Sequence, residues 1–412
     1  MRIADLKGLF FIAGGTKFSF IWRICFTLWS VFLIALIIKS LAIPGKQSVF
    51  GVYVDGVKHW WSDESLYAKY PGIDFFRYAP SAVFLFEPFV LFGPVFGPLI
   101  WGILSVCAVF YACKLMAGTF WPSNSDWGIG GIMALLCALS GLWNHQSNAI
   151  IGFLLVFGTI NIYQNKSGQS ALLFSIACVL KSTVLPVVAL LLILKPFSML
   201  WRIILIFLLF AILPFLTRPP ETVIWQYLEW GRHLQSTHDI RWPGYRDFWF
   251  VILSIAEWIR PGEYDPQFWN CSAPSLYKFV QAGTGLCCLL FAFIWRSLPP
   301  VDWYPRTLAL GLAWLMVFGP ATELPTYGLF APMLCWAFVR QFTNVQNCRL
   351  NGQSFILTVS FAFLLVLAQR EFTIFFAPAF PVILSAAPIG SIIFIIWLIR
   401  DTRFLLHLKN DR

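Results

Sequence analysis

The chain has 412 residues, of which 59% are hydrophobic and only 12% are charged. A soluble domain carries about a quarter charged residues, so a soluble globule of this length could not cover its surface with polar groups. The composition therefore excludes an ordinary soluble protein and predicts contact with lipid. The net charge is +10, but the basic residues are scattered near the ends of apolar runs. That pattern favours positive-inside anchoring, and we expect no nucleic-acid partner.

The apolar runs are continuous rather than alternating, which favours membrane helices over the strands of a barrel. We therefore expect an all-α polytopic membrane protein with about 10–12 transmembrane helices in a single domain, residues 1–412. The first run, 19–43, is too long for a signal peptide and is interpreted as the first span. The further expected spans are 97–117, 127–143, 147–163, 170–194, 200–217, 274–296, 304–319, 326–341, 353–369 and 378–399.

Basic residues flank the two ends of this pattern, and they predict that both termini are cytoplasmic. They are Arg2, Lys7, Lys17 and Arg23 at the start, and Arg400, Arg403, Lys409 and Arg412 at the end. The ten cysteines include no CxxC pair, and most lie in apolar runs, so no disulfide framework or zinc site is indicated. We expect no metal and no cofactor.

Two long segments, 44–79 and 218–272, interrupt the apolar pattern, and we expect them to face outward together. The first is predicted to hold a short helix near 52–61, on which Asp55 and His59 share one face because residues four apart are neighbours. Functional residues concentrate in such loops.

Two apolar segments are broken. Residues 81–93 carry Glu87-Pro88 and are too short to cross simply, which implies a cavity or protein cover. Residues 170–194 carry Lys181 in the middle. The segment is either one kinked span or a hairpin with Lys181 at its tip.

Several polar residues could carry chemistry. Asp55 is the first choice for a general base that deprotonates an acceptor hydroxyl, with Asp63, Glu64 and Asp74 as further acids of the same loop. Each could instead be a solvated loop acid. Lys181 could hold a phosphate as a point charge, or it could be an internally paired or snorkelling lysine.

Other candidates surround these two roles. Arg77 and Arg246 suit phosphate recognition, although Arg246 could equally pair with Asp247. Gln146 and Asn148, in WNHQSN, either cap a short loop or line the same cavity. Glu323, in GPATELPTYGLFAP, either binds sugar hydroxyls or belongs to a turn built by two prolines.

The order of several motifs resembles glycosyltransferase family 87, from the first long segment to about residue 340. The motifs are Val52-Tyr53, Leu66-Tyr67, Tyr78-Ala79-Pro80 followed by LFEPFVLFG, His145-Gln146-Ser147-Asn148, Leu180-Lys181 with Pro186, and GPATELPTYGLFAP. The chain departs from the family in two places. His145 stands where the family's Gly-Gln-x-Asn motif has glycine, and the slot of the family's usual acid falls near Ser48 or Val49, where there is no carboxylate.

The resemblance implies a GT-C type fold in the bacterial inner membrane. It implies transfer of a hexose, mannose first, from a polyprenyl-phosphate carrier to a hydroxyl of a glycolipid or glycan. Lys181, Arg77, Tyr78, Gln146, Asn148, Arg246 and Glu323 are then substrate-binding residues and Asp55 is the base. A secondary transporter would also have broken helices and a midplane charge. A non-catalytic glycolipid-binding protein or flippase is the other alternative.

Overall fold

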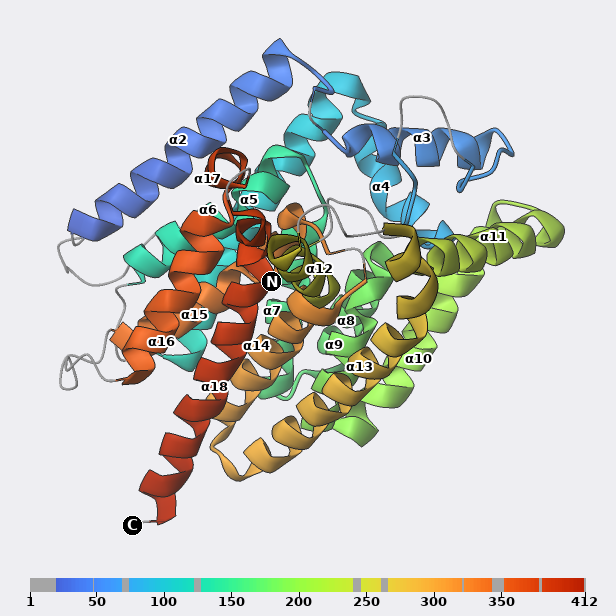
Figure 1. The fold of residues 1–412 in the computed structure, drawn as a ribbon. Coiled ribbons are helices and arrows are strands. Elements are labelled where there is room, and N and C mark those ends of the chain that lie inside the picture. The colour runs from blue at the N-terminus through green and yellow to red at the C-terminus, as the bar shows by residue number, and fades with distance from the viewer. Residues whose placement is uncertain are drawn as a thin grey trace.

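The computed structural model describes residues 20–46, 48–68, 74–121, 127–239, 246–260, 266–320, 322–342, 352–377 and 380–410, and every regular element there is helical (Figure 1). The α-helices are α2 (Phe20–Ala42), α3 (Phe50–Trp61), α4 (Val83–Val90), α5 (Gly93–Phe120), α6 (Gly128–Trp143), α7 (Asn148–Tyr163), α8 (Ser167–Leu180), α9 (Leu185–Leu191), α10 (Pro196–Ile212), α11 (Pro220–Asp239), α12 (Phe248–Ile259), α13 (Pro266–Ile294), α14 (Pro300–Phe318), α15 (Ala331–Phe342), α16 (Gly352–Ala362), α17 (Arg370–Phe376) and α18 (Ala386–Asn410).

Five of the described helical segments are long and apolar enough to cross a membrane. They are Phe20–Ala42, Gly93–Phe120, Pro196–Leu216, Leu276–Ser297 and Val382–Thr402. Several other expected spans form shorter helices. α6 and α7 have 16 residues each, about 24 Å at 1.5 Å per residue, which is less than a hydrocarbon core of about 30 Å. The all-helical prediction is confirmed, although among the described residues only these five segments combine the length and the hydropathy expected for a span.

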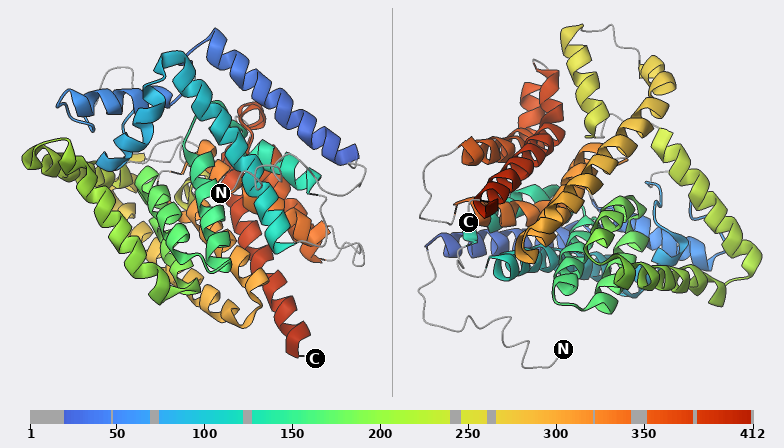
Figure 2. Two further views of the ribbon diagram at one scale, coloured as in Figure 1. Left: turned by 180° about the vertical axis from the view of Figure 1, so that it is seen from behind. Right: turned by 90° about the horizontal axis from the view of Figure 1, so that it is seen from below.

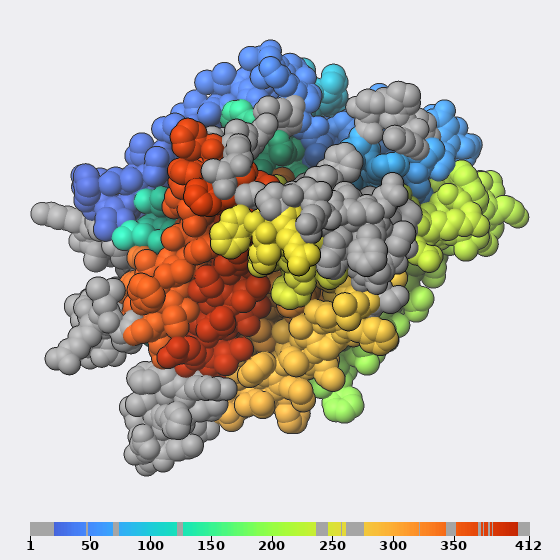
Figure 3. Space-filling model, in the orientation of Figure 1, coloured from blue at the N-terminus to red at the C-terminus, as the bar shows by residue number. Residues whose placement is uncertain are grey.

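The centre of the molecule is a bundle in which α5, α6, α7, α14 and α15 pack on one another, while α2 lies along its outside (Figures 1 and 2). Figure 3 shows α2, in blue, and the described part of α13, in gold, at the surface of the face seen in Figure 1. The short 3-10 helix η6 (Leu324–Leu329) enters the bundle and packs on α6 and α7. This approach requires small residues. A Cβ atom on Gly141 would lie 2.7 Å from the carbonyl oxygen of Pro325, and one on Gly152 would lie 3.2 Å from that of Leu329.

Residues 167–194 form a hairpin. α8 leads to Lys181, whose backbone is extended (φ −157°, ψ 99°), and η2 (Ser182–Val184) and α9 then lead back. The side chain of Lys195, just after the hairpin, donates to the side chain of Asn165, just before it. The residues just before and just after the hairpin therefore lie next to each other, and Lys181 is at the tip of the hairpin.

The two long polar segments are linked to each other. The first contains α3, in the range where a short helix was expected, and the second contains α11 and α12 rather than an irregular loop. Gln226 on α11 accepts a hydrogen bond from the backbone N–H of Leu66 (3.1 Å) and donates to the carbonyl oxygen of Glu64 (2.8 Å). Residues 240–245 and 261–265 of the second segment lie outside the described residues.

A buried network of charges ties α14, α15 and α18 together. Arg306, whose side chain is fully buried, pairs with Asp302 (2.8 Å) and Asp401, and Arg340 pairs with the same two carboxylates at 2.8 and 2.9 Å. The network is near the start of α14, whereas η6 follows its end. It therefore fixes the bundle at the end opposite to the site described next.

Candidate functional site

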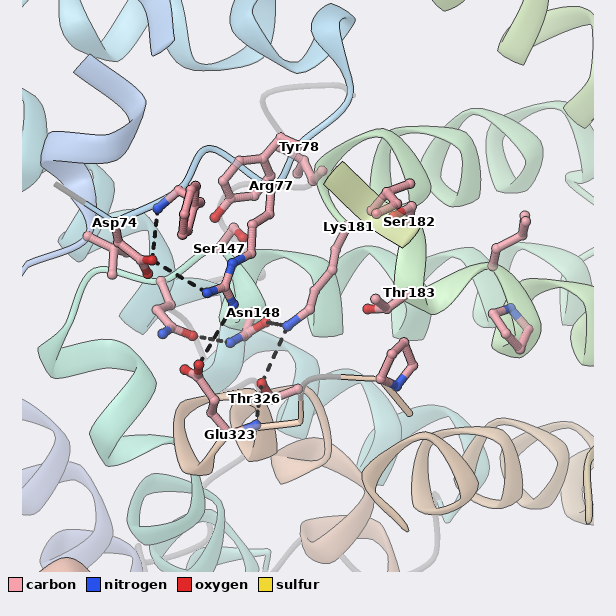
Figure 4. Close-up of a pocket in the computed structure, with 18 of the residues that line it drawn as sticks. Asp74, Arg77, Tyr78, Ser147, Asn148, Lys181, Ser182, Thr183, Glu323 and Thr326 are labelled. Atoms are coloured by element: carbon pink, nitrogen blue, oxygen red, sulfur yellow. Dashed lines mark hydrogen bonds and ion pairs between the residues drawn. The ribbon is translucent and has the colours of Figure 1, made fainter. Parts of the chain in front are cut away.

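A cavity of about 630 Å³ lies where the segment after α3, the α6–α7 loop, the hairpin tip, α13 and η6 come together (Figure 4). Its polar lining is contributed by Asp74, Arg77, Tyr78, Gln146, Ser147, Asn148, Lys181, Ser182, Thr183, Gln281, Glu323 and Thr326. Its apolar lining includes Val49, Val52, Leu180, Leu185, Pro186 and Trp314. Cavities of this size, with a few convergent polar groups, are typical ligand sites.

Lys181 projects from the hairpin tip into this cavity. Its ammonium donates to the amide oxygen of Asn148 (2.9 Å) and to the hydroxyl of Thr326 (3.4 Å). Both acceptors are uncharged, and within the described ranges no carboxylate oxygen lies within the 4.0 Å of an ion pair to this ammonium. A cation held in this way keeps its charge available for an anionic ligand.

Asn148 is the group that positions this lysine. The side chain is buried at the start of α7, and its amide nitrogen donates to the carbonyl oxygen of Pro325 (3.0 Å) and to the side-chain oxygen of Gln146. These donations orient the amide so that its oxygen points at Lys181. The α6–α7 loop is fixed in turn because the backbone N–H of Ser147 donates to the hydroxyl of Tyr53 (3.1 Å).

Arg77 lies between two carboxylates of the cavity, and both pairs are long. The distance from Nη2 to Asp74 Oδ1 is 3.4 Å, and that from Nη1 to Glu323 Oε1 is 3.8 Å. Its Nε atom is buried and has no hydrogen-bond partner among the described residues. The guanidinium therefore retains donors for a further anion.

Glu323 is fixed by the helix that follows it. Its side chain accepts from the backbone N–H of Thr326, and the Thr326 hydroxyl accepts from the backbone N–H of Glu323, which together form a capping box at the start of η6. Burial raises the pKa of Glu323, and the neighbouring Arg77 and Lys181 oppose this rise only in part. A partly buried carboxylate of raised pKa beside two cations is suited to accept a proton.

The structure brings six of the eight predicted site residues together as cavity-lining residues: Arg77, Tyr78, Gln146, Asn148, Lys181 and Glu323. Tyr78 donates from its hydroxyl to that of Tyr53 (3.2 Å). Two predicted residues lie apart. Arg246 is next to the Glu323 loop, where its backbone N–H donates to the carbonyl oxygen of Thr322 (2.5 Å) and its guanidinium stacks on Phe250. Asp55 is half-buried on α3 and does not line the cavity.

The position of α3 explains why Asp55 does not line the cavity. Val49 and Val52 are the residues at its start that line the cavity, and the family resemblance places the usual acid near Ser48 or Val49. The carboxylates in the lining are instead Asp74 and Glu323.

Sequence reasoning did not select Gln281 and Trp314, which line the cavity from α13 and α14. An amide within the apolar run 274–296 was the available signal, because polar residues inside membrane helices are often functional.

The sequence profile of glycosyltransferase family 87 matches residues 75–317, more than half of the chain. The chain belongs to glycosyltransferase family 87. This family 87 protein is therefore a multi-pass membrane glycosyltransferase with a GT-C type fold. The matched region contains Arg77, Gln146, Asn148 and Lys181, and it ends before Glu323. No match was found among curated proteins. Across the described residues, no group of three or more His, Cys, Asp or Glu side chains is arranged to hold a metal ion.

Proposed function

We propose that this family 87 glycosyltransferase transfers a hexose, mannose first, from a polyprenyl-phosphate carrier to a hydroxyl of a glycolipid or glycan. The observation that carries the proposal is Lys181, a cation at the tip of a membrane hairpin that is held by two uncharged acceptors and faces a cavity. We place the cavity at the outer face of a bacterial inner membrane, with both termini cytoplasmic.

Lys181 and Arg77 are proposed to hold the phosphate of the donor. The leaving group of this reaction is a phosphate, which needs its developing charge stabilised more than it needs a proton. A lysine supplies a compact charge and an arginine supplies several directed donors. Glu323 and Asp74 are each near Arg77 only at long ion-pair distances, so the guanidinium is held weakly and can turn to a phosphate.

A second cavity supports a lipid-linked donor. It has a volume of about 730 Å³ and lies among α2, α4, α5, α7 and α8, with a lining that is almost entirely apolar. Leu85 and Phe89, from the broken segment 81–93, are part of this lining. Leu180 lines both cavities and directly precedes Lys181. A polyprenyl tail in this groove would bring its phosphate to the lysine.

Glu323 is proposed as the general base in place of Asp55, because it lines the cavity and Asp55 does not. The acceptor oxygen attacks the anomeric carbon, and the bond from that carbon to the phosphate oxygen breaks. The hydroxyl proton passes to Glu323. Polyprenyl phosphate leaves with an additional negative charge on its phosphate, and Lys181 and Arg77 stabilise that charge. Tyr78, Gln146 and Asn148 complete the binding site, and Arg246 supports the Glu323 loop from outside it.

The test is sugar transfer by the protein in nanodiscs, with radiolabelled polyprenyl-phosphate-mannose or -glucose and a native lipid extract as acceptor. Lys181→Met should lower kcat/KM about 10- to 150-fold, since a hydrogen bond to a charged group is worth about 1.5–3 kcal/mol. Lys195→Met removes the lysine at the opposite end of the same hairpin and serves as the control, with full activity expected. Absence of product with both donors from folded wild-type protein would refute the proposed donor class.

A further inference from the structure

The cavity has two chemically different halves. The charged half consists of Asp74, Arg77, Gln146, Asn148, Lys181 and Glu323. The neutral half consists of Ser182, Thr183, Gln281, Ala282, Gly285 and Trp314, and no described Asp, Glu, Lys or Arg contributes to it. Figure 4 shows Thr183 on the side of Lys181 that faces away from Asp74 and Arg77. α13 carries Gln281, Ala282 and Gly285 and α14 carries Trp314, and these two helices pack on each other and on α9.

We propose that the neutral half is the subsite for the acceptor, and that the acceptor is an uncharged saccharide on a lipid anchor. The inference rests on the proposed function, in which the donor phosphate takes the charged half and its tail takes the groove beyond Leu180. The neutral half is then the space left beside the reacting centre.

Trp314 supplies an aromatic platform in this half. Its indole N–H donates to the hydroxyl of Thr284 (3.0 Å), and its ring packs on Phe318 with centroids 6.2 Å apart. Gly285 has no side chain next to the ring, where a Cβ atom would lie 3.6 Å from Cζ2. The fixed ring therefore borders open space. The C–H face of a pyranose is apolar and weakly positive, which matches the negative face of an aromatic ring.

Hydroxyls and an amide complement this platform. The side chains of Ser182 and Thr183 line the cavity, and neither hydroxyl has a hydrogen-bond partner in the part of the chain that the structure describes. Gln281 uses its amide nitrogen for the carbonyl oxygen of Phe318, which leaves its amide oxygen for a ligand hydroxyl. Uncharged donors and acceptors suit the hydroxyls of a neutral sugar, whereas a phosphate or carboxylate would find no counterion here.

The exposed walls of the neutral half are the reason for proposing that the acceptor carries a lipid anchor. Leu185 on α9 is 51% exposed although it lines the cavity, and Ala282 on α13 is likewise exposed. The cavity therefore reaches the surface between α9 and α13. Phe279, on the outer surface of α13, is 77% exposed, as expected for a helix that faces lipid. A glycolipid in the membrane could insert its sugar here while its chains stay outside.

The experiment is equilibrium binding of tritiated dodecyl mannoside and dodecyl glucoside to the protein in nanodiscs, with empty nanodiscs subtracted. It does not require transfer activity, so it can fail independently of the proposed function. Wild-type protein should show saturable binding. Gly285→Leu fills the space beside Trp314 and should weaken binding about tenfold or more, equivalent to about 1.4 kcal/mol.

Matched controls are available on the same helices. Gly283→Leu makes the same change two residues away, where nothing lies within 4 Å, and should alter binding less than about twofold. Trp314→Leu removes the platform and should match Gly285→Leu. Thr284→Val removes only the hydrogen bond to the ring and should cost less than about threefold.

Competing ligands identify the class of acceptor. Dodecyl glucuronide, which carries a carboxylate, should compete about tenfold less well than dodecyl mannoside. Methyl mannoside should also compete poorly, and equal competition would mean that a soluble saccharide is the acceptor and would overturn the lipid anchor. Absence of saturable binding with both neutral glycosides, or equal effects of Gly285→Leu and Gly283→Leu, would overturn the subsite.

Discussion

The ammonium of Lys181 and the amide oxygen of Asn148 are 2.9 Å apart, so the side chain that positions this lysine is uncharged. An amide oxygen orients the lysine without neutralising it. A carboxylate in the same place would orient it equally well but would compete with any anion that the lysine binds.

Asn148→Asp tests this relationship. The new carboxylate should pair with Lys181 and raise the KM for the polyprenyl-phosphate donor about tenfold or more, because the donor phosphate must displace it. Asn165→Asp is the matched control, since Asn165 accepts from Lys195 at the base of the same hairpin. Its KM for the donor should remain at the wild-type value. Equal donor KM values for the two variants would show that Lys181 does not bind the phosphate.

The pH dependence of transfer tests Glu323. A general base must be ionised to accept a proton, and burial raises the pKa of Glu323. Activity should therefore be lost as the pH falls through this raised value, with an acid limb of kcat/KM above the pKa of a free glutamate, about 4.3. Glu323→Gln should lower kcat about 10²- to 10⁴-fold and remove that limb.

Asp55→Asn is the comparison for the same measurement, because Asp55 was the base expected from the sequence. It should keep both the activity and the acid limb. Loss of activity in Asp55→Asn with retention in Glu323→Gln would return the catalytic role to α3.

Glu323 and Asp55 show how much of the site could be predicted from the sequence. Composition and continuous apolar runs predicted an all-helical membrane fold, and motif order predicted the family. The same motifs contain five of the six predicted residues that line one cavity, and the sixth, Arg77, directly precedes one of the motifs. The proposed base could not be selected in this way, because acids occur both in the first long segment and at Glu323, and the sequence does not reveal which of them faces the cavity.

Tertiary packing supplied the missing information. The choice between a kinked span and a hairpin at 170–194 was decided by Lys195 contacting Asn165, a pairing that an all-apolar pattern cannot encode. Trp314 and Gln281 reach the cavity only because α13 and α14 pack beside α9. The span lengths also depend on packing, since short helices such as α6 and α7 are largely enclosed by their neighbours.

The buried network around Arg306 should contribute stability rather than activity. Arg306→Met leaves Asp302 and Asp401 with Arg340 alone, and breaking a buried ion pair costs about 3–5 kcal/mol. Thermal unfolding in detergent should show a clearly lower Tm, while the donor KM of the remaining folded protein stays unchanged. Arg232→Met removes an arginine that is 71% exposed and pairs with Glu229. This control should change stability by less than about 1 kcal/mol. A wild-type Tm for Arg306→Met would contradict the structural role.

Gly141→Ala tests whether the close approach of η6 to α6 matters for catalysis. The new Cβ would lie 2.7 Å from the carbonyl oxygen of Pro325, a backbone atom that can move away only if η6 shifts. The same oxygen accepts the hydrogen bond that orients Asn148, so the shift should misplace Lys181 as well as Glu323. Overpacking of this kind costs about 1–3 kcal/mol, and small misplacements at a reacting centre can cost about 10²-fold in rate.

We therefore expect Gly141→Ala to lower kcat/KM about tenfold or more and to lower Tm. Gly118→Ala, on α5, is the control, because nothing lies within 4 Å of its new Cβ and alanine favours the helix by up to about 1 kcal/mol. Equal activity of the two variants would show that the hydrogen bond from Asn148 to the carbonyl oxygen of Pro325 does not position the site. Combining Gly141→Ala with Asn148→Asp separates the two explanations further. If both act through the position of Lys181, their effects on the donor KM should fall short of additivity, as expected for residues that share one partner.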